Sequence, residues 1–220
     1  MDTNPDRPES DLCQVQVAVL AKAPIAGLAK SRLIPALGAQ GAARLQRSFT
    51  RNAVGVAQAA SLGTVTLWCA PNAQHRFFQA LVRTAGVACL VQPNGDLGQR
   101  MHLAFQFHCE QGPLLLTGTD CPPLRPVHLR QAARALLDGD DAVFYPAEDG
   151  GYVLVGLLKP QPALFEDLPW STSEVMAETR KRAKALGLRV REFEILWDVD
   201  TPSDLARWRA STAASLAVSA

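Results

Sequence analysis

Three groups of charged side chains in this sequence could carry out phosphate chemistry. The first is the segment KAPIAGLAKSRL (22–33), which follows the apolar run VQVAVLA and contains Lys22, Lys30 and Arg32. Cations in a loop between a strand and a helix can hold an anion together with backbone N–H groups. The loop lacks the glycines of a P-loop or of a dinucleotide-binding G-x-G-x-x-G. It is therefore either an unusual phosphate loop or a solvated basic loop, whose exposed cations would contribute little to stability.

The second group is one carboxylate at a predicted strand end. In LLLTGTDCPPL, Asp120 follows a buried apolar run and precedes two prolines, which delay helix formation. Open α/β sheets bind ligands at the carboxyl ends of their strands, and Mg²⁺ or Mn²⁺ bound to phosphate prefers oxygen ligands there. Asp120 is thus a candidate metal ligand and catalytic residue; alternatively, it only bonds its own backbone.

The third group is the aspartate pair in WDVDTPSDL. Thr201 and Pro202 match an N-cap followed by a first-turn proline, so they predict a helix start. Asp198 and Asp200 are not needed for that cap, and adjacent carboxylates repel unless a cation lies near. They are candidate metal ligands, and one of them is expected to share a divalent cation with Asp120, because the carboxyl ends of parallel strands open on the same edge of a sheet.

Two further segments combine turn signals with polar side chains. In PAEDGGYVLVG, the Asp-Gly-Gly sequence predicts a hairpin turn in which Gly150 or Gly151 has positive φ. In PWSTSEV, Ser171 to Glu174 match a capping box, which predicts a helix from about residue 173 to 186.

Alternating strands and helices must position these residues. Apolar runs at 15–21, 64–70, 87–92 and 113–118 predict strands, and helical spacing appears at 41–60, 73–85, 99–110 and 126–138. A hairpin around residue 150, a strand LRVREFEIL and a last helix from Pro202 follow. We expect an α/β fold with a mostly parallel, mixed sheet in one domain at 15–210, between a disordered tail at 1–14 and a C-terminal tail at 211–220.

Composition limits the function classes. With 22 basic and 21 acidic residues, the net charge of +1 gives no general attraction to nucleic acid or membrane. Five scattered cysteines without a C-x-x-C pair are typical of reduced thiols, and the start of the chain has no signal-peptide pattern. Without an apolar run of about 18 residues, we expect no membrane span and a cytoplasmic protein.

The motifs KAPIAGLAKSRL, NGDLGQRM, LLLTGTDCPPL, EDGGYVLVGL, PWST and DVDTPSDL occur in one order over about residues 15–208. In this the chain resembles a bacterial branch of the nucleotide-diphospho-sugar transferase superfamily, whose members are often labelled as arsenosugar-biosynthesis-type glycosyltransferases. The resemblance implies a GT-A-like fold, a three-layer α/β/α Rossmann-like sandwich that binds a nucleotide at its amino-terminal half. Related guanylyltransferases of cofactor biosynthesis also carry a Lys and an Arg in the first loop.

The resemblance also implies roles for particular residues. The nucleotide and its phosphates would be bound by Lys22, Gly27, Lys30, Arg32, Gly98 and Arg100. The metal, Mg²⁺ or Mn²⁺, would be bound by Asp120 with Asp198 or Asp200. A small-molecule acceptor would contact Gly150, Gly151, Tyr152, Trp170, Ser171 and Thr172, with Asp149 as general base.

These residues predict a metal-dependent transferase with a nucleotide-activated donor. A glycosyltransferase using an NDP-sugar is the first hypothesis. The sequence TDC, however, offers one carboxylate where glycosyltransferases have D-x-D, which keeps a nucleotidyltransferase that releases pyrophosphate as the alternative. A nucleotide-binding protein without turnover is a third possibility, because fold does not determine function.

Overall fold

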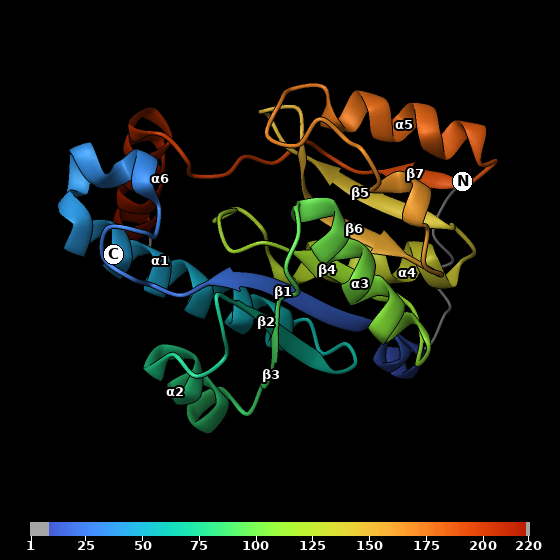
Figure 1. Cartoon of the computed structure of the whole chain (residues 1–220), viewed down its shortest axis with the longest axis horizontal. Coiled ribbons are helices and arrows are strands. Elements are labelled where there is room, and N and C mark those ends of the chain that lie inside the picture. Colours follow the sequence, from blue (N-terminus) through green and yellow to red (C-terminus); the bar gives the residue numbers. More distant parts are fainter. Residues whose placement is uncertain (1–8, 219–220) are drawn as a thin grey trace.

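The computed structural model describes the chain from residue 9 to residue 218. A seven-stranded sheet with the order β3-β2-β1-β4-β6-β5-β7 forms its centre (Figure 1). The strands are β1 (Gln16–Lys22), β2 (Val65–Ala70), β3 (Ala88–Val91), β4 (Leu114–Thr117), β5 (Ala142–Pro146), β6 (Tyr152–Leu157) and β7 (Val190–Glu192).

The sheet is mixed because of one hairpin. Strand β6 returns from β5 through the turn at 147–151 and pairs antiparallel with both β5 and β4. All other pairs are parallel. Consequently, the carboxyl ends of β1 and β4 and the start of β6 lie at the same edge of the sheet. The prediction of a mostly parallel, mixed sheet is confirmed.

Helices cover both faces of the sheet, which makes three layers. The helices are α1 (Ile34–Ala59), α2 (Arg76–Ala85), α3 (Leu97–Cys109), α4 (Pro126–Leu137), α5 (Val175–Ala185) and α6 (Pro202–Val218), with 3-10 turns at Glu9–Gln14, Ser31–Leu33 and Pro162–Leu164. Helices α1, α2 and α4 share one hydrophobic core with the sheet. Helices α3 and α5 share a second core on the other face, around Phe105, Phe144 and Phe165.

A third, smaller core joins α6 to the start of α1. It contains Leu33, Leu45, Phe49, Val199 and Leu205. The ring centroids of Phe49 and of Trp208 on α6 are 5.0 Å apart. Figure 1 shows α6 beside α1, at the side of the fold away from α5. This core therefore links the segment just after the basic loop to the segment 197–205.

Several boundaries differ from the sequence predictions. Residues 9–14 of the expected disordered tail form a 3-10 helix whose Leu12 is buried, so that prediction is wrong there; residues 1–8 lie outside the described part. Helix α6 continues to Val218, into the expected C-terminal tail. Strand β7 is only three residues long, much shorter than the predicted strand LRVREFEIL; beyond it, the segment follows β5 through single backbone hydrogen bonds and the bridge between Ala147 and Leu196.

The predicted capping box at Ser171 does not form. Helix α5 begins at Val175 with Glu174 as its N-cap, and no side chain caps it. Ser171 has a φ of 65°, so the chain turns at the residue that would have been the cap. In contrast, the predicted cap at Thr201 is confirmed: α6 begins at Pro202, and Thr201 accepts a hydrogen bond from the backbone N–H of Asp204.

Among the described residues, no helix is both long and apolar enough to cross a membrane.

Candidate functional site

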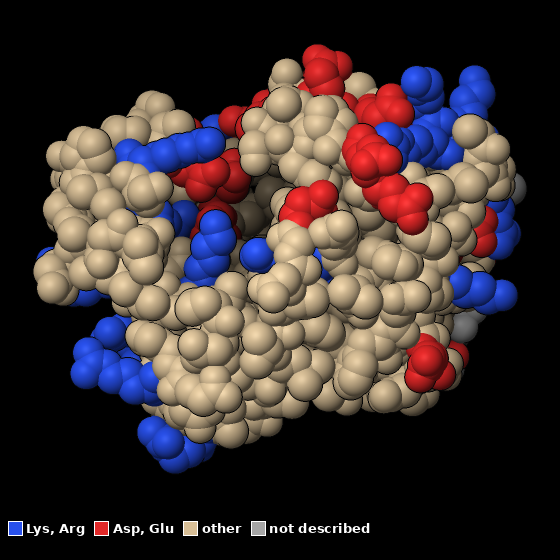
Figure 2. Space-filling view, in the orientation of Figure 1, with Lys and Arg blue, Asp and Glu red and all other residues tan. Residues whose placement is uncertain are grey.

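A cleft of about 780 Å³ opens at the carboxyl ends of β1 and β4. Of the residues that the sequence predicted for the site, the cleft is lined by Lys22, Lys30, Arg32, Arg100, Asp120, Asp149, Gly151, Tyr152, Trp170, Ser171, Thr172, Asp198 and Asp200. Gly27, Gly98 and Gly150 do not line it. Acidic and basic side chains meet at a hollow in the surface in Figure 2. The fold thus brings together residues from six sequence motifs.

Lys30 lies at the centre of the charged end of the cleft. Its ammonium Nζ is 3.0 Å from Asp120 Oδ1 and 3.9 Å from Asp200 Oδ1, and it donates a 2.8 Å hydrogen bond to the carbonyl of Val199. Only 4% of the Lys30 side chain is exposed, whereas 68% of the Arg32 side chain is. The expectation of an exposed loop cation is therefore wrong for Lys30, because the small third core draws its loop against the segment around Val199.

The aspartates of the cleft act on one another electrostatically. Burial raises the pKa of Asp198 to about 6, and the carboxylates of Asp200, Asp149 and Asp120 add to this shift. Burial and Asp120 raise the pKa of Asp200, although Lys30 and Arg32 oppose the shift. The partly buried carboxylates of the cleft therefore carry more negative charge than Lys30 offsets, so a further cation would be stabilised there.

Neutral side chains that the sequence reasoning missed fix the position of Asp120. The hydroxyl of Thr119 donates a 2.8 Å hydrogen bond to Asp120 Oδ1. The amide of Gln46 on α1 donates to Thr119 and to Thr50, at 3.0 and 3.2 Å. All three are buried. Gln46 and Thr50 are four residues apart on the otherwise apolar face of α1, and that break in the pattern was the available signal.

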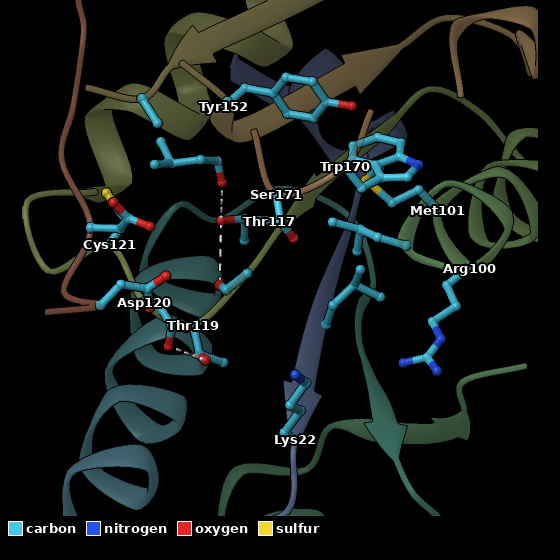
Figure 3. Close-up of a pocket in the computed structure, with 18 of the residues that line it drawn as sticks. Lys22, Arg100, Met101, Thr117, Thr119, Asp120, Cys121, Tyr152, Trp170 and Ser171 are labelled. Atoms are coloured by element: carbon cyan, nitrogen blue, oxygen red, sulfur yellow. Dashed lines mark hydrogen bonds between the residues drawn. The ribbon is translucent and has the colours of Figure 1, made fainter. Parts of the chain in front are cut away.

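Cations also stand on the other side of the cleft. Figure 3 shows Lys22 and Arg100 across from Asp120. The Arg100 guanidinium donates to the carbonyl of Gly95 at 3.1 Å and to the side chain of Gln92 at 3.3 Å. The Gln92 side chain in turn donates hydrogen bonds to two carbonyls of β1 and β2, so the position of Arg100 is fixed relative to the sheet. Lys22 and Arg100 would attract an anion to the side of the cleft that faces the aspartates.

The wall beyond these charges is aromatic. Trp170 and Tyr152 lie together in Figure 3, with ring centroids 6.4 Å apart. A Cβ at Gly98 would lie 2.8 Å from Trp170 Nε1, so α3 has glycine where the indole packs against it. Gly98 thus supports the wall from behind instead of contacting a ligand directly.

The turn that carries Asp149 packs closely against the segment before α5. Gly150 has a φ of 90°, as the sequence predicted for one glycine of this turn. Its carbonyl accepts a 2.8 Å hydrogen bond from the backbone N–H of Met176. Asp149 Oδ1 accepts a 2.9 Å hydrogen bond from the N–H of Gly151, which orients the carboxylate at the cleft.

The oxygen donors of the cleft fit a hard divalent cation whose shell is completed by phosphate. Carboxylates are the protein ligands of Mg²⁺ in such sites, and one or two suffice when phosphates supply the rest. The carboxylates in the cleft that match this requirement belong to Asp120, Asp198 and Asp200. Within residues 9–218, no three His, Cys, Asp or Glu side chains are already arranged as a metal site. The protein's share of the coordination would be two carboxylates.

The architecture and the position of the cleft define a protein with the fold of the nucleotide-diphospho-sugar transferases. Residues 53–172 match the family model DUF2064, described as uncharacterized proteins conserved in bacteria, and the chain belongs to this family. No curated protein matches the chain.

Solved structures share the fold. A Desulfovibrio desulfuricans G20 protein, provisionally described as a nucleotide-diphospho-sugar transferase, is 26% identical, with a TM-score of 0.77 and coverage of 86% of this chain and 83% of that chain. CMP:2-keto-3-deoxy-manno-octonic acid synthetase complexed with CTP is 16% identical (TM-score 0.58; 91% and 99% covered). Glucosyl-3-phosphoglycerate synthase from Mycobacterium tuberculosis, in complex with Mn²⁺ and UDP, is 8% identical (TM-score 0.56; 94% and 81% covered). These neighbours are nucleotidyl and glycosyl transferases of one fold.

Proposed function

We propose that this protein is a transferase that uses a nucleotide-activated donor, with an NDP-sugar as the donor and a small molecule as the acceptor. The observation that carries the proposal is the charged end of the cleft, where Lys30 lies between Asp120 and Asp200 and the exposed Arg32 stands beside them. Cations and carboxylates side by side at strand ends suit a phosphate group bound together with a divalent cation.

In this proposal, Arg32, Lys22 and Arg100 bind the phosphates of the donor. Asp120 would hold Mg²⁺ or Mn²⁺ with Asp198 or Asp200, and the bound ion would offset the negative charge that develops on the leaving phosphate. The hydrogen bonds from Thr119 and Lys30 keep the Asp120 carboxylate oriented toward the cleft.

The acceptor binds against the aromatic wall. Trp170 and Tyr152 offer an apolar surface, and Ser171 and Thr172 add polar groups at its edge. Asp149, in the turn just before Tyr152, also lines the cleft and would take the proton from the acceptor hydroxyl as it attacks the donor. The bond between the transferred sugar and the nucleotide phosphate breaks as the bond between the sugar and the acceptor oxygen forms. The products are therefore the modified acceptor and a nucleoside diphosphate.

A nucleotidyltransferase is the second candidate. It is favoured by the single carboxylate of TDC and by the similarity to a synthetase solved with CTP, which is covered over 99% of its length. In that case an NTP would be the donor and pyrophosphate the leaving group, with the same phosphate-binding residues.

Binding and product analysis test the proposal. The protein is screened for thermal stabilisation by NDP-sugars and NTPs with Mg²⁺ or Mn²⁺, since a ligand that binds the native state raises the unfolding temperature. Turnover is then followed on the stabilising donors with a panel of hydroxyl-bearing acceptors. Release of nucleoside diphosphate supports the first candidate, and pyrophosphate supports the second. Binding without turnover would identify a nucleotide-binding protein, and no binding of any nucleotide would refute the proposal.

Asp120→Asn is the matched variant for this screen, because it keeps the size of the side chain and removes its charge. We expect it to abolish metal-dependent nucleotide binding. Circular dichroism checks that the variant is folded, because Asp120 also pairs with the buried Lys30. Normal turnover by a folded Asp120→Asn protein would contradict the assigned role.

A further inference from the structure

Helix α6 contacts the turn that carries Asp149 through a pair of charged side chains. Glu148, the residue before Asp149, accepts hydrogen bonds from both terminal nitrogens of Arg207, at 2.6 and 3.0 Å. The Arg207 guanidinium also lies over the ring of Trp197, 4.3 Å from its centroid. The two hydrogen bonds to the carboxylate and the contact with the aromatic ring together fix the orientation of the guanidinium.

The same helix also fixes the backbone at Asp200. The Asp204 carboxylate accepts hydrogen bonds from the backbone N–H of Thr201 at 2.7 Å and of Asp200 at 3.2 Å. Thus α6 contacts the chain beside two of the cleft aspartates, Asp149 and Asp200. Its own position is set by the small core around Phe49 and Leu205, separate from the two main cores.

Few other contacts hold the turn at 147–151 on this side. The N–H of Glu148 donates to the carbonyl of Leu196 at 3.0 Å, next to the isolated bridge that ends the pairing. Beyond this bridge, Arg207 is the described side chain that ties the turn to the segment 193–200 and to α6. On this side of the turn, the placement of Asp149 therefore depends on this contact, whereas the N–H of Gly151 and the packing of Gly150 against the segment before α5 hold the other side.

We propose that Arg207 is a positioning residue that holds Asp149 in its working orientation through Glu148. The inference rests on the proposed function, in which Asp149 accepts the proton of the acceptor. Both partners are about half exposed, at 49% and 51% of their side chains, so the pair contributes little to stability. Its effect is on geometry, since misplacing a reacting group by about 1 Å can lower a rate about a hundredfold.

The chain provides a matched control in a second arginine–glutamate pair that is also joined by two hydrogen bonds. Arg180 on α5 donates two hydrogen bonds to Glu192 on β7, at 2.8 and 2.7 Å, and neither residue lines the cleft. Arg207→Ala and Arg180→Ala therefore each remove one exposed two-bond contact. Only the first of these contacts touches the turn at 147–151.

The experiment compares three variants, Arg207→Ala, Glu148→Ala and Arg180→Ala, with the wild-type protein. Amide hydrogen exchange reports the mobility of residues 147–151, and steady-state kinetics report kcat and KM. We expect Arg207→Ala and Glu148→Ala to exchange about tenfold faster in that turn and to lose about tenfold in kcat, while KM for the donor stays unchanged. Combining Arg207→Ala with Glu148→Ala should add no further loss, because both remove one contact.

Exchange unchanged at 147–151 in Arg207→Ala would overturn the inference. So would faster exchange with a kcat equal to that of Arg180→Ala, since the contact would then be structural only. If the wild-type protein turns over no donor, the proposed function fails separately. The exchange comparison then still decides whether Arg207 holds the turn, because it requires no substrate.

Discussion

Replacing Gly150 by alanine tests how closely the turn with Asp149 approaches the segment before α5. Gly150 has a φ of 90°, and a Cβ there would lie 2.6 Å from the Cα and 2.7 Å from the carbonyl carbon of Ser173. These are backbone atoms that cannot rotate away, so either the turn or the segment must shift. The change thus combines two costs, strain at positive φ and a steric clash.

Gly27 separates the two costs. Its φ of 87° nearly equals that of Gly150, but a Cβ there meets nothing within 4 Å. We expect Gly27→Ala to lower the free energy of unfolding by about 1 kcal/mol, the cost of the left-handed backbone alone. Gly150→Ala adds a backbone displacement worth about 2 kcal/mol, so its loss should be about 3 kcal/mol.

Urea unfolding, monitored by tryptophan fluorescence and by circular dichroism, measures the free energy of unfolding of both variants. An unchanged m-value shows that the midpoint shift reports stability. Because Gly150→Ala also displaces the turn, the variant should lose activity with the proposed acceptor even where it is fully folded. Equal losses of stability in Gly150→Ala and Gly27→Ala would refute the close packing of the turn against Ser173.

Three further predictions follow from burial, charge and close packing. Because the pKa of Asp198 is raised to about 6, its folded form binds a proton more tightly than the unfolded chain does, so with chelator present stability should fall as pH rises from about 4 to 6. Urea unfolding at pH 4.5 and 7.5 should show a loss that is larger in the wild type than in Asp198→Asn by about 1 kcal/mol after solvent screening, because the raised pKa of Asp200 remains in the variant. Lys30→Met leaves two carboxylates without their buried counter-ion and should lower the free energy of unfolding by about 2 kcal/mol. Arg32→Ala should change that free energy by less than about 0.5 kcal/mol but weaken nucleotide binding, as measured by calorimetry. Equal stability losses would contradict the different burial of the two cations. Gly98→Ala should displace Trp170, which a shift of its fluorescence maximum would show, and an unchanged spectrum would argue against this contact.

Local patterns in the sequence were enough to predict most elements of the fold. Apolar runs bounded by breakers located β1 to β4; β1, β2 and β4 are buried, and a strand covered on both faces must be apolar, whereas β3 is a partly exposed edge strand. The Asp-Gly-Gly turn and the cap at Thr201 were also predictable, because each depends on residues within four positions of one another. The expectation that Asp120 lies near the pair at 198 and 200 was reasoned from parallel strand ends, but β7 ends at Glu192, and the hydrogen bond from the Val199 N–H to the Asp120 carbonyl joins the two segments.

Contacts between distant residues could not be predicted in this way. Lys30 was assigned to an exposed loop, and its burial depends on Val199, which is 169 positions away in the chain. The capping box predicted at Ser171 failed for the same reason: the backbone of this segment is set by tertiary packing of Ser173 against Gly150. Local spacing carries no information about such contacts.

The sequence by itself thus determined the strands, the turn glycine and the types of charged residue at the strand ends. Only the tertiary structure decided which cation is buried between the carboxylates, which aspartates raise the pKa of one another, and that Arg207 reaches Glu148. The physical reason is that charge interactions depend on distance and burial in three dimensions. Those quantities are fixed when α6 packs on α1 through residues that are themselves ordinary apolar side chains.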